Sequence, residues 1–407
     1  MVQAVGGIRK EVKNMKITSD IKYIGVDDRQ IDLFEGLYTV PEGMSYNSYL
    51  ILDDMIAVMD TVDANFTEQW LDNIQGVLGN RQPDYLIVQH MEPDHSANIM
   101  SFVKKFPQAV VVASAKAFTM MKHFFGTEFL EKRIVVSDGD MLFLGRHKLI
   151  FATAMMVHWP EVIVTYDSTE KVLFSADAFG RFGALKERDD GLKKQITEEE
   201  WTKEARRYYF GIVGKYGISV QKLLKKLADW DIRMICSLHG SVLSGNIGYY
   251  TGLYHIWSGY QPEEEGVMIA YTSIYGNTKK AVMLLAEKLK EKGCRKVVIR
   301  DLARCDKYEA VAEAFRYSRL VLATTTYNTV LFPPMREFLS ELTERNFSNR
   351  MVAFMENGSW MPVAAKLMRE RLEKSKGLVF AENSVKIMSA LEEESMAQLE
   401  QLAEELC

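Results

Sequence analysis

The segment that decides the fold reads YLIVQHMEPDH and covers residues 85–95. Its first part, residues 85–89, is almost wholly apolar, which predicts a strand buried on both faces. Four potential metal ligands follow at once: His90, Glu92, Asp94 and His95. A strand that ends in a loop presents such side chains at the rim of a sheet, where they can converge on a metal. The alternative is a solvated turn in which the Asp caps a helix.

Three further ionisable residues each follow or end a predicted strand, at wide spacing along the chain. They are His158, Asp177 and His239. One histidine after a strand is common, but three apolar runs that all end on an ionisable residue favour the metal site. The series resembles the metallo-β-lactamase superfamily, whose HxHxDH motif is followed by a His, an Asp and a His. Residues 20 to about 260 fit that plan in order and spacing.

One position departs from the hydrolases of that superfamily, because Glu92 stands where they carry the second His of the motif. A carboxylate in place of an imidazole hardens the site and moves it from zinc toward iron or manganese. HxExDH followed by a flavodoxin-like domain resembles the flavodiiron proteins. That resemblance implies two irons, bridged by Asp177. The ligands would be His90, Glu92 and His158 for one iron and Asp94, His95 and His239 for the other. The remaining histidines, His123, His147 and His255, lack comparable context.

Short apolar runs alternate with helical segments through the first 260 or so residues. Predicted strands cover residues 44–52, 55–60, 85–89, 109–113, 134–136, 148–153, 162–166, 171–174 and 234–238. A helix is predicted at residues 66–78, where apolar residues recur every three to four positions, and residues 198–229 are charged and helix-rich. The segment QPEEEG at residues 261–266 combines a proline, like charges and a glycine, which indicates a linker.

The rest of the chain repeats strand, glycine-containing loop and helix. Predicted strands cover residues 267–271, 296–301, 320–324 and 351–355, and predicted helices cover residues 279–292, 308–317 and 392–405. This order predicts a doubly wound parallel sheet. We therefore expect two α/β domains: a metallo-β-lactamase-like αβ/βα sandwich over residues 1–262, with an N-terminal extension at 1–20, and a flavodoxin-like domain over residues 263–407. Single cores stop growing near about 250 to 300 residues, which agrees with two domains.

A phosphate-binding loop is predicted directly after the strand at residues 267–271. Hydroxyls, a glycine and free backbone N–H groups at a helix N-terminus make an anion site, because the unpaired donors and the positive dipole end point the same way. The loop has neither Walker A spacing nor GxGxxG, which disfavours a nucleoside triphosphate or a dinucleotide. An ordinary turn with a Thr cap is the alternative. The candidates are Thr272, Ser273, Ile274, Tyr275, Gly276, Asn277 and Thr278.

Two later loops follow the third and fourth strands of this half, at the strand ends where open α/β sheets bind ligands. Tyr327 and Trp360 can pack on an isoalloxazine while nearby amides and hydroxyls meet its polar edge. With TxxYGNT at residues 272–278, these loops resemble flavodoxins, which bind FMN. The loop at residues 356–360 departs from the glycine- and tyrosine-rich form common in that family. The candidates are Thr324, Thr325, Thr326, Tyr327, Asn328, Asn357, Gly358, Ser359 and Trp360.

The resemblance to flavodiiron proteins implies an oxidoreductase. FMN would take electrons from an external donor and pass them to the diiron site, where dioxygen is reduced to water or nitric oxide to nitrous oxide. A head-to-tail homodimer, or a dimer of dimers, is implied because that family's FMN lies far from the irons of its own chain. No CxxC pairs of a rubredoxin are present, so we expect a separate donor. The first candidate for this electron donor is rubredoxin, and the second is reduced deazaflavin or a flavin reductase system.

Composition excludes several other classes. The net charge of −5 and the lack of a Lys/Arg-rich run disfavour nucleic acid. The N-terminus has no continuous apolar core, and no stretch approaches the roughly 18 apolar residues of a membrane span, so we expect a cytoplasmic protein without a membrane partner. The four cysteines lie far apart without a CxxC pair, which predicts reduced structural thiols.

Two other functions compete with this interpretation. A zinc hydrolase of the metallo-β-lactamase superfamily with an FMN or accessory domain would need no redox chemistry, and Glu92 and the FMN-like loops count against it. A pure electron carrier would use only the flavodoxin-like part. Seven intact ligand positions argue against a decayed metal domain.

Overall fold

The computed structural model describes residues 17–185 and 196–407, so most of the predicted extension at residues 1–20 lies outside the described residues. The chain divides into two compact units: Met1–Ala205 with Lys225–Ile247, and Arg206–Leu224 with Gly248–Cys407. The predicted boundary between residues 262 and 263 remains a prediction. In the described residues, no helix is both long and apolar enough to cross a membrane.

The first unit is built on two six-stranded sheets. Their orders are β1-β6-β7-β8-β9-β10 and β11-β12-β13-β14-β15-β16. The strands of the first sheet are β1 (Ile21–Tyr23), β6 (Tyr49–Ile51), β7 (Ala57–Met59), β8 (Tyr85–Val88), β9 (Val110–Ala113) and β10 (Arg133–Val135). Those of the second are β11 (Met141–Phe143), β12 (Lys148–Thr153), β13 (Ile163–Asp167), β14 (Val172–Phe174), β15 (Met234–Cys236) and β16 (Leu243–Ser244). Two small ribbons, β2 (Val26–Asp28) with β5 (Met44–Tyr46) and β3 (Leu33–Phe34) with β4 (Tyr38–Thr39), complete the strands.

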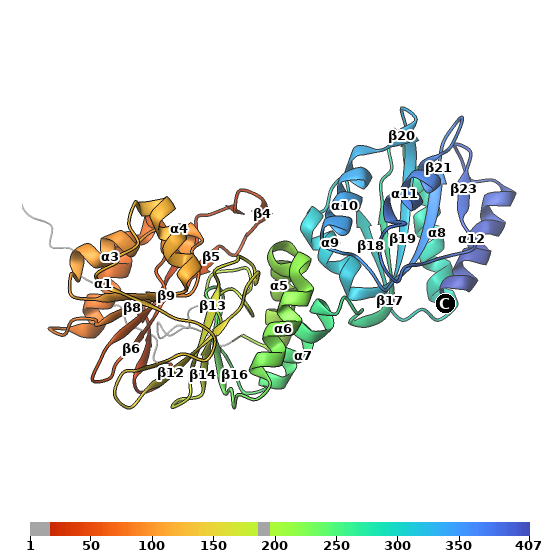
Figure 1. Cartoon of the computed structure of the whole chain (residues 1–407). Helices are drawn as coiled ribbons and strands as arrows, with labels where there is room; N and C mark the ends of the chain where they lie inside the picture. Colours follow the sequence, from red (N-terminus) through yellow and green to blue (C-terminus); the bar gives the residue numbers. More distant parts are fainter. Residues whose placement is uncertain (1–16, 186–195) are drawn as a thin grey trace, which may run out of the picture. The chain divides into compact units, whose positions relative to one another are not determined.

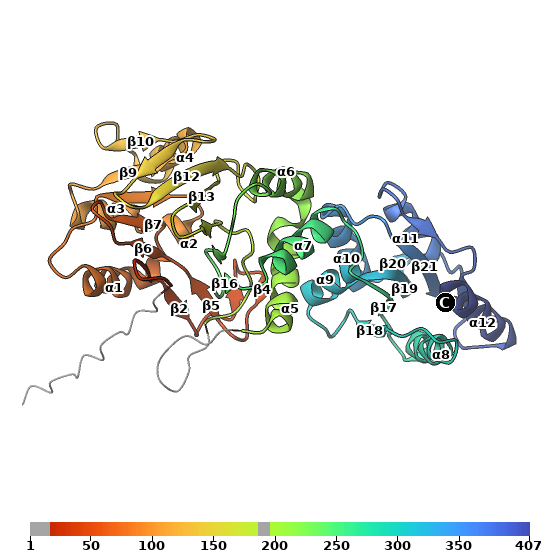
Figure 2. The same cartoon turned by 90° about the horizontal axis from the view of Figure 1, so that it is seen from below.

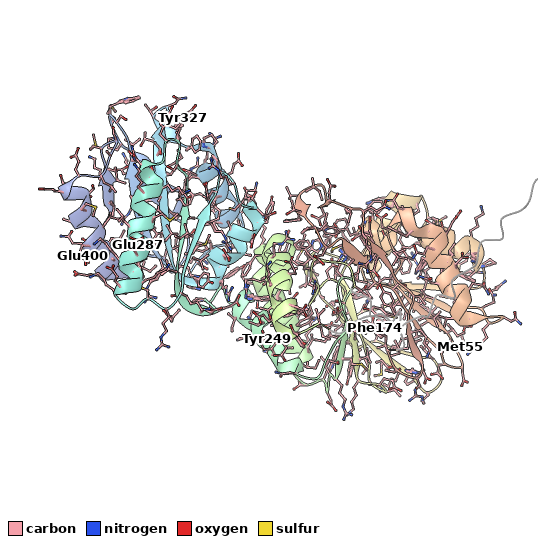
Figure 3. All side chains as sticks on the ribbon, turned by 180° about the vertical axis from the view of Figure 1, so that it is seen from behind. Met55, Phe174, Tyr249, Glu287, Tyr327 and Glu400 are labelled. Atoms are coloured by element: carbon pink, nitrogen blue, oxygen red, sulfur yellow. A yellow bond between two sulfur atoms is a disulfide. The ribbon has the colours of Figure 1, made fainter. Side chains whose placement is uncertain are left out.

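The facing sides of the two sheets form one apolar core. Tyr49 and Ile87 from the first sheet and Phe151 and Phe174 from the second belong to the same buried cluster, and the rings of Tyr49 and Phe174 meet edge to face with their centroids 5.6 Å apart. Figure 3 labels Phe174 within this domain. Burial of each such side chain contributes about 1.5–3 kcal/mol. The core therefore fixes the two sheets against each other and sets the positions of the loops at their ends.

Helices flank these sheets. In this unit they are α1 (Thr67–Leu78), α2 (Pro93–Ser96), α3 (Ile99–Lys105), α4 (Ala115–Phe125) and most of α5 (Glu198–Tyr208). Helices α6 (Gly217–Leu227) and α7 (Ile247–Ser258) fall mostly in the second unit. Of these, α1, α3 and α4 lie on the outer side of the first sheet (Figures 1 and 2). Helix α1 packs there because its apolar residues recur every three to four positions, which places Trp70, Ile74 and Leu78 on one buried face. The helix ends at Gly79, whose φ of 58° suits glycine.

The second unit contains a parallel sheet in the order β18-β17-β19-β21-β22. Its strands are β17 (Glu264–Tyr271), β18 (Val297–Asp301), β19 (Tyr317–Tyr327), β20 (Val330–Leu331), β21 (Met351–Asn357), β22 (Val379–Phe380) and β23 (Val385–Ile387). Its helices are α8 (Asn277–Glu291), α9 (Lys307–Arg316), α10 (Pro333–Glu344), α11 (Ala364–Leu372) and α12 (Glu393–Leu406). Buried residues of α8 and α12 share one cluster with the sheet, while α9, α10 and α11 follow one another on the remaining side (Figure 1). Both predicted fold classes are confirmed.

Strand ends differ most from the sequence-based prediction. We predicted that the third strand of this unit stops at residue 324 and that a loop follows, but β19 continues to Tyr327. The extra residues stay extended because Thr326 and Tyr327 pair with Leu331 and Val330 of β20. Likewise β21 reaches Asn357, two residues beyond its predicted end. Several of the predicted cofactor residues therefore lie on strands, which hold them more rigidly than a loop would.

The prediction of four reduced thiols is wrong for two of them. Cys294, after α8, and Cys407, after α12, form a disulfide with their Cα atoms 5.8 Å apart. The two residues are 113 positions apart, so no spacing motif marks them. They meet because α8 and α12 pack side by side (Figure 3). An ion pair between Lys288 Nζ and Glu400 Oε2, at 2.5 Å, joins the two helices. Cys236 and Cys305 are free.

This crosslink can be tested by counting thiols. In denaturant without reductant we expect two reactive thiols per chain, and four after reduction. Cys407→Ser should lower the free energy of unfolding by about 2–4 kcal/mol, because an open chain gains conformational entropy when it unfolds. Cys305→Ser is the matched control and should leave the unfolding transition unchanged. Four thiols without reductant would contradict the disulfide.

Candidate metal centre and cofactor pocket

The structure brings the seven predicted ligands together in two groups. His90, Glu92, His158 and Asp177 form the first, and Asp94, His95 and His239 form the second. Within each group the potential ligand atoms all lie within 4.8 Å of one another. The residues come from the segment after β8 and helix α2, from the loop between β12 and β13, and from the segments after β14 and β15. Loops far apart in the sequence thus build one centre.

Asp177 faces both groups. Its Oδ2 lies 3.1 Å from His158 Nε2 and 3.3 Å from His90 Nε2, while its Oδ1 lies 3.4 Å from His95 Nε2 and 3.7 Å from His239 Nε2. One carboxylate oxygen therefore points at each group. A carboxylate in this position can bridge two metal ions.

Acceptor atoms face one another in the second group. His239 Nδ1 lies 2.7 Å from the carbonyl oxygen of Ser45, so this nitrogen donates and Nε2 of a neutral His239 carries a lone pair. That lone pair faces His95 Nε2 at 3.0 Å and Asp94 Oδ2 at 3.3 Å. Both carboxylate oxygens of Asp94 are buried without a hydrogen-bond partner in the described residues. Such a convergence of lone pairs fits a metal ion, because buried acceptors otherwise remain unpaired.

The carboxylates of the centre raise the pKa of neighbouring imidazoles, so the centre favours positive charge. Burial lowers the pKa of His95, but the carboxylates of Asp94 and Asp177 outweigh burial and raise that pKa to about 10. Burial likewise lowers the pKa of His158, and Asp177 and Glu92 raise it to about 9. Divalent metal ions would supply the same positive charge to neutral imidazoles. The centre offers three carboxylates and four imidazoles. This set of ligands suits iron, whereas zinc is favoured by sites rich in sulfur.

The backbone around the ligands is held by buried hydrogen bonds. The carboxylate of Asp60 accepts from the N–H of Gln89 at 2.7 Å and from the N–H of His90 at 3.3 Å. Burial raises the pKa of Asp60 to about 6 although the Gln89 side chain and backbone lower it. On the other side, the carbonyl of His95 accepts from the N–H of Thr61 at 2.9 Å and from its hydroxyl at 2.7 Å. The end of β7 therefore fixes both ends of the HMEPDH segment.

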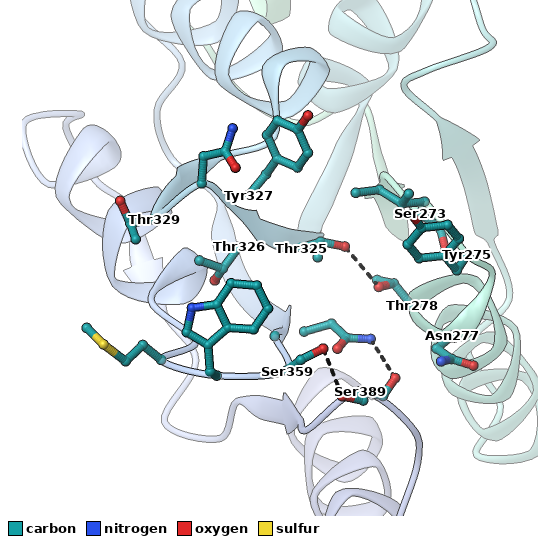
Figure 4. Close-up of a pocket in the computed structure, with 16 residues that line it drawn as sticks. Ser273, Tyr275, Asn277, Thr278, Thr325, Thr326, Tyr327, Thr329, Ser359 and Ser389 are labelled. Carbon is teal, nitrogen blue, oxygen red and sulfur yellow. Dashed lines mark hydrogen bonds between the residues drawn. The ribbon is translucent and has the colours of Figure 1, made fainter.

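A second site lies at the carboxyl ends of the strands in the flavodoxin-like unit. Figure 4 shows a pocket between the loop before α8, the end of β19, and the segment after β21. Gly276, at φ 94°, precedes α8, and the first two residues of this helix, Asn277 and Thr278, line the pocket. The hydroxyl of Ser273 accepts from the N–H of Gly276 at 3.1 Å and from that of Lys279 at 3.2 Å. Tyr275 is 95% exposed and Trp360 73% exposed, which leaves two aromatic rings available to a flat ligand. The pocket offers hydroxyls, amides and aromatic rings to one molecule.

Most of the predicted cofactor residues line this pocket. They are Ser273, Ile274, Tyr275, Asn277, Thr278, Thr325, Thr326, Tyr327, Asn328, Asn357, Gly358, Ser359 and Trp360. Three predicted residues do not line it: Thr272 and Thr324 are fully buried and join their hydroxyls at 2.6 Å, and Gly276 shapes the turn. The structure adds Thr329, Met361 and Ser389. Ser389, which follows β23, donates its hydroxyl to the hydroxyl of Ser359 at 2.9 Å (Figure 4). No sequence pattern predicts this contact.

Comparison with known proteins points to one family. The model "ODP family beta lactamase" matches residues 44–240. The anaerobic nitric oxide reductase flavorubredoxin of Salmonella arizonae is 29% identical over 364 residues, which cover 88% of this chain and 74% of the relative. The rubredoxin oxygen:oxidoreductase of Desulfovibrio gigas superposes with a TM-score of 0.88 at 26% identity, over 97% of this chain and 98% of that one. In sequence and in fold, this chain is similar to the flavodiiron proteins. The flavodiiron protein of Giardia intestinalis has the same fold, with a TM-score of 0.88 at 24% identity and 98% coverage of both chains.

Glu35, which no sequence pattern marks, interacts electrostatically with residues of the metal centre. Glu35 occupies the turn of the β3–β4 hairpin, with φ 53°, next to Gly36. The hairpin is anchored by Phe34, whose ring lies 5.3 Å from that of His239. The side chain of Glu35 is exposed to solvent on one side, and partial desolvation, followed by the charge of Glu92, raises its pKa to about 7. No strand or ligand motif precedes Glu35, so only the three-dimensional structure reveals its place beside the centre.

His147, which the sequence analysis set aside, belongs to a separate ionic network. Its ligand atoms lie within 4.8 Å of those of Asp20 and Glu170. The guanidinium of Arg146 donates to both of these carboxylates, so the network contains its own cation. His147 Nδ1 lies 2.7 Å from Asp167 Oδ2. Burial lowers the pKa of His147, and Asp167 outweighs burial and raises it. These contacts explain His147 as a structural residue.

The cofactor pocket can be tested by an isosteric substitution. We expect Thr278→Val to weaken FMN binding about two- to tenfold, because it removes one pocket hydroxyl and a hydrogen bond contributes about 0.5–1.5 kcal/mol. The measurement is quenching of FMN fluorescence on titration into flavin-free protein. Thr343→Val is the control, since the Thr343 hydroxyl donates at 3.0 Å to the Leu339 carbonyl of its own helix. Unchanged affinity of Thr278→Val would contradict the placement of FMN.

Proposed function

We propose that this protein is an oxidoreductase that reduces dioxygen, nitric oxide or both at a non-heme diiron site, with electrons delivered through FMN. The observation that carries the proposal is the placement of Asp177 between two groups of ligands. One shared carboxylate allows two metal ions to act on the same small molecule. The pocket before α8 supports FMN as the electron carrier.

Different residues of the chain would bind each of the two irons. His90, Glu92 and His158 would hold one iron, Asp94, His95 and His239 the other, and Asp177 would bridge them. When bound, the iron pair supplies the electrons and the open positions for bond chemistry. Dioxygen consumes four electrons and four protons to give two waters, and two nitric oxide molecules consume two electrons and two protons to give nitrous oxide and water.

Different parts of the pocket would bind different parts of FMN. Ser273, Asn277 and Thr278 would bind the phosphate at the N-terminus of α8. Tyr327 and Trp360 would pack against the isoalloxazine, whose polar edge would meet Asn357 and neighbouring amides. The exposure of Tyr275 and Trp360 leaves this ligand open to a second protein.

The donor and assembly are part of the same proposal. The names of the relatives, a flavorubredoxin and a rubredoxin oxygen:oxidoreductase, support a rubredoxin-type donor and both gases as substrates. We infer a cytoplasmic homodimer in which the flavin of one subunit serves the metal centre of the other. The zinc hydrolase alternative is not favoured, because the matched relatives are reductases and Glu92 replaces an imidazole ligand.

Metal and flavin content tests the proposal directly. Protein purified without oxygen should contain two irons and one FMN per chain. Zinc with no flavin would overturn the redox function and favour the hydrolase. The measurement is elemental analysis together with the absorbance of released flavin.

A substitution separates the two sites. His95→Asn should abolish reduction of dioxygen and nitric oxide, because it removes a ligand of the second group, while the donor still reduces the flavin. The control is His123→Asn, an exposed position on α4. Gas consumption and flavin bleaching are followed on the same sample. Normal turnover of His95→Asn would contradict the diiron assignment.

A further inference from the structure

Glu161 is a buried carboxylate that the proposed reaction does not use. It is 2% exposed and lies in the loop between β12 and β13, three residues after His158. Its Oε1 lies 2.8 Å from His90 Nδ1 and accepts from the N–H of Met91, also at 2.8 Å. Its backbone carbonyl accepts from the hydroxyl of Ser114 at 2.8 Å. Burial of a carboxylate is costly unless such partners compensate it, so its place beside a predicted ligand needs a reason.

The contact determines which nitrogen of His90 can bind a metal. A carboxylate oxygen only accepts, so His90 Nδ1 must carry the hydrogen. The lone pair of a neutral His90 is then on Nε2, which lies 3.2 Å from Glu92 Oε2 and 3.3 Å from Asp177 Oδ2. Nε2 thus points into the first ligand group. The ring is also held from the side by Trp159, edge to face at 5.3 Å.

The ligand imidazoles do not share this support equally. His239 Nδ1 bonds to a neutral acceptor, the carbonyl of Ser45, at 2.7 Å. His95 Nδ1 has no hydrogen-bond partner in the described part of the chain. Of these three imidazoles, therefore, His90 alone has a carboxylate on Nδ1 within the described residues. A carboxylate partner fixes the tautomer and raises the basicity of the nitrogen that binds metal.

We propose that Glu161 is a positioning residue that fixes His90 with Nε2 free and strengthens the hold of the first group on its metal. The proposal rests on the proposed diiron function. The two metal positions then differ in affinity, because only the first receives the added negative charge. Glu161 and His158 lie on one loop, so the same loop supplies both a ligand and the support of a second ligand.

The chain offers a matched control for this contact. Asp167 Oδ2 lies 2.7 Å from Nδ1 of His147, both side chains are buried, and His147 is outside the metal centre. Asp167→Asn therefore removes the same kind of carboxylate–imidazole pair as Glu161→Gln. Only the second change should alter the metal centre.

Anaerobic titration of Fe(II) into the metal-free, full-length protein measures the effect. We expect Glu161→Gln to bind one of the two irons about 10–100-fold more weakly than wild type, with the other unchanged, and Asp167→Asn to bind both like wild type. Equal affinities in wild type and Glu161→Gln would overturn the role of Glu161. Failure of the wild type to bind two irons would instead contradict the proposed function.

A second measurement does not depend on a folded variant. In wild-type protein loaded with Zn(II) and labelled with ¹⁵N-histidine, the His90 signals should show a hydrogen on Nδ1 and the metal on Nε2. This tautomer supports the role of Glu161 even where Glu161→Gln fails to fold. A hydrogen on Nε2 would overturn it.

Discussion

A single buried carboxylate, Asp177, faces two groups of imidazoles, with its Oδ2 3.1 Å from His158 Nε2 and its Oδ1 3.4 Å from His95 Nε2. Glu92 and Asp94 add two more negative charges at the same centre. Removing such charges from water costs several kcal/mol per ion unless positive charge compensates them. The centre therefore depends on bound cations or protonated imidazoles, and two metal ions satisfy all of its acceptors at once.

The fold meets this requirement by joining the ends of two sheets. Because β14 and β15 are parallel neighbours, the segments that follow them bring Asp177 and His239 to the same edge. The first sheet delivers HMEPDH from the end of β8, and the N–H of Ile163 in β13 donates at 3.1 Å to the carbonyl of Gln89. This bond links the two sheets beside the ligands. The apolar core between the sheets keeps their ends aligned, so packing energy sustains the metal geometry.

The sequence predicted those parts of the protein that local patterns encode. Apolar runs identified most of the central strands, and HMEPDH identified the metal centre, because ligands and strand lie together in the chain. The signal was weaker where contacts are distant: Glu161 meets His90 across 71 positions, and Cys294 meets Cys407 across 113. Ser389 and Glu35 lie in segments whose residue types fit any turn. Strand ends such as that of β19 depend on pairing with β20, which no local pattern reveals.

Anomalous X-ray diffraction at the iron edge, from crystals grown without oxygen, tests the central claim most directly. The account predicts two iron peaks per chain. One should be bound by His90 Nε2, Glu92 and His158, the other by Asp94, His95 and His239, with the two oxygens of Asp177 on different irons. A single peak, or peaks at the zinc edge alone, would contradict a diiron centre.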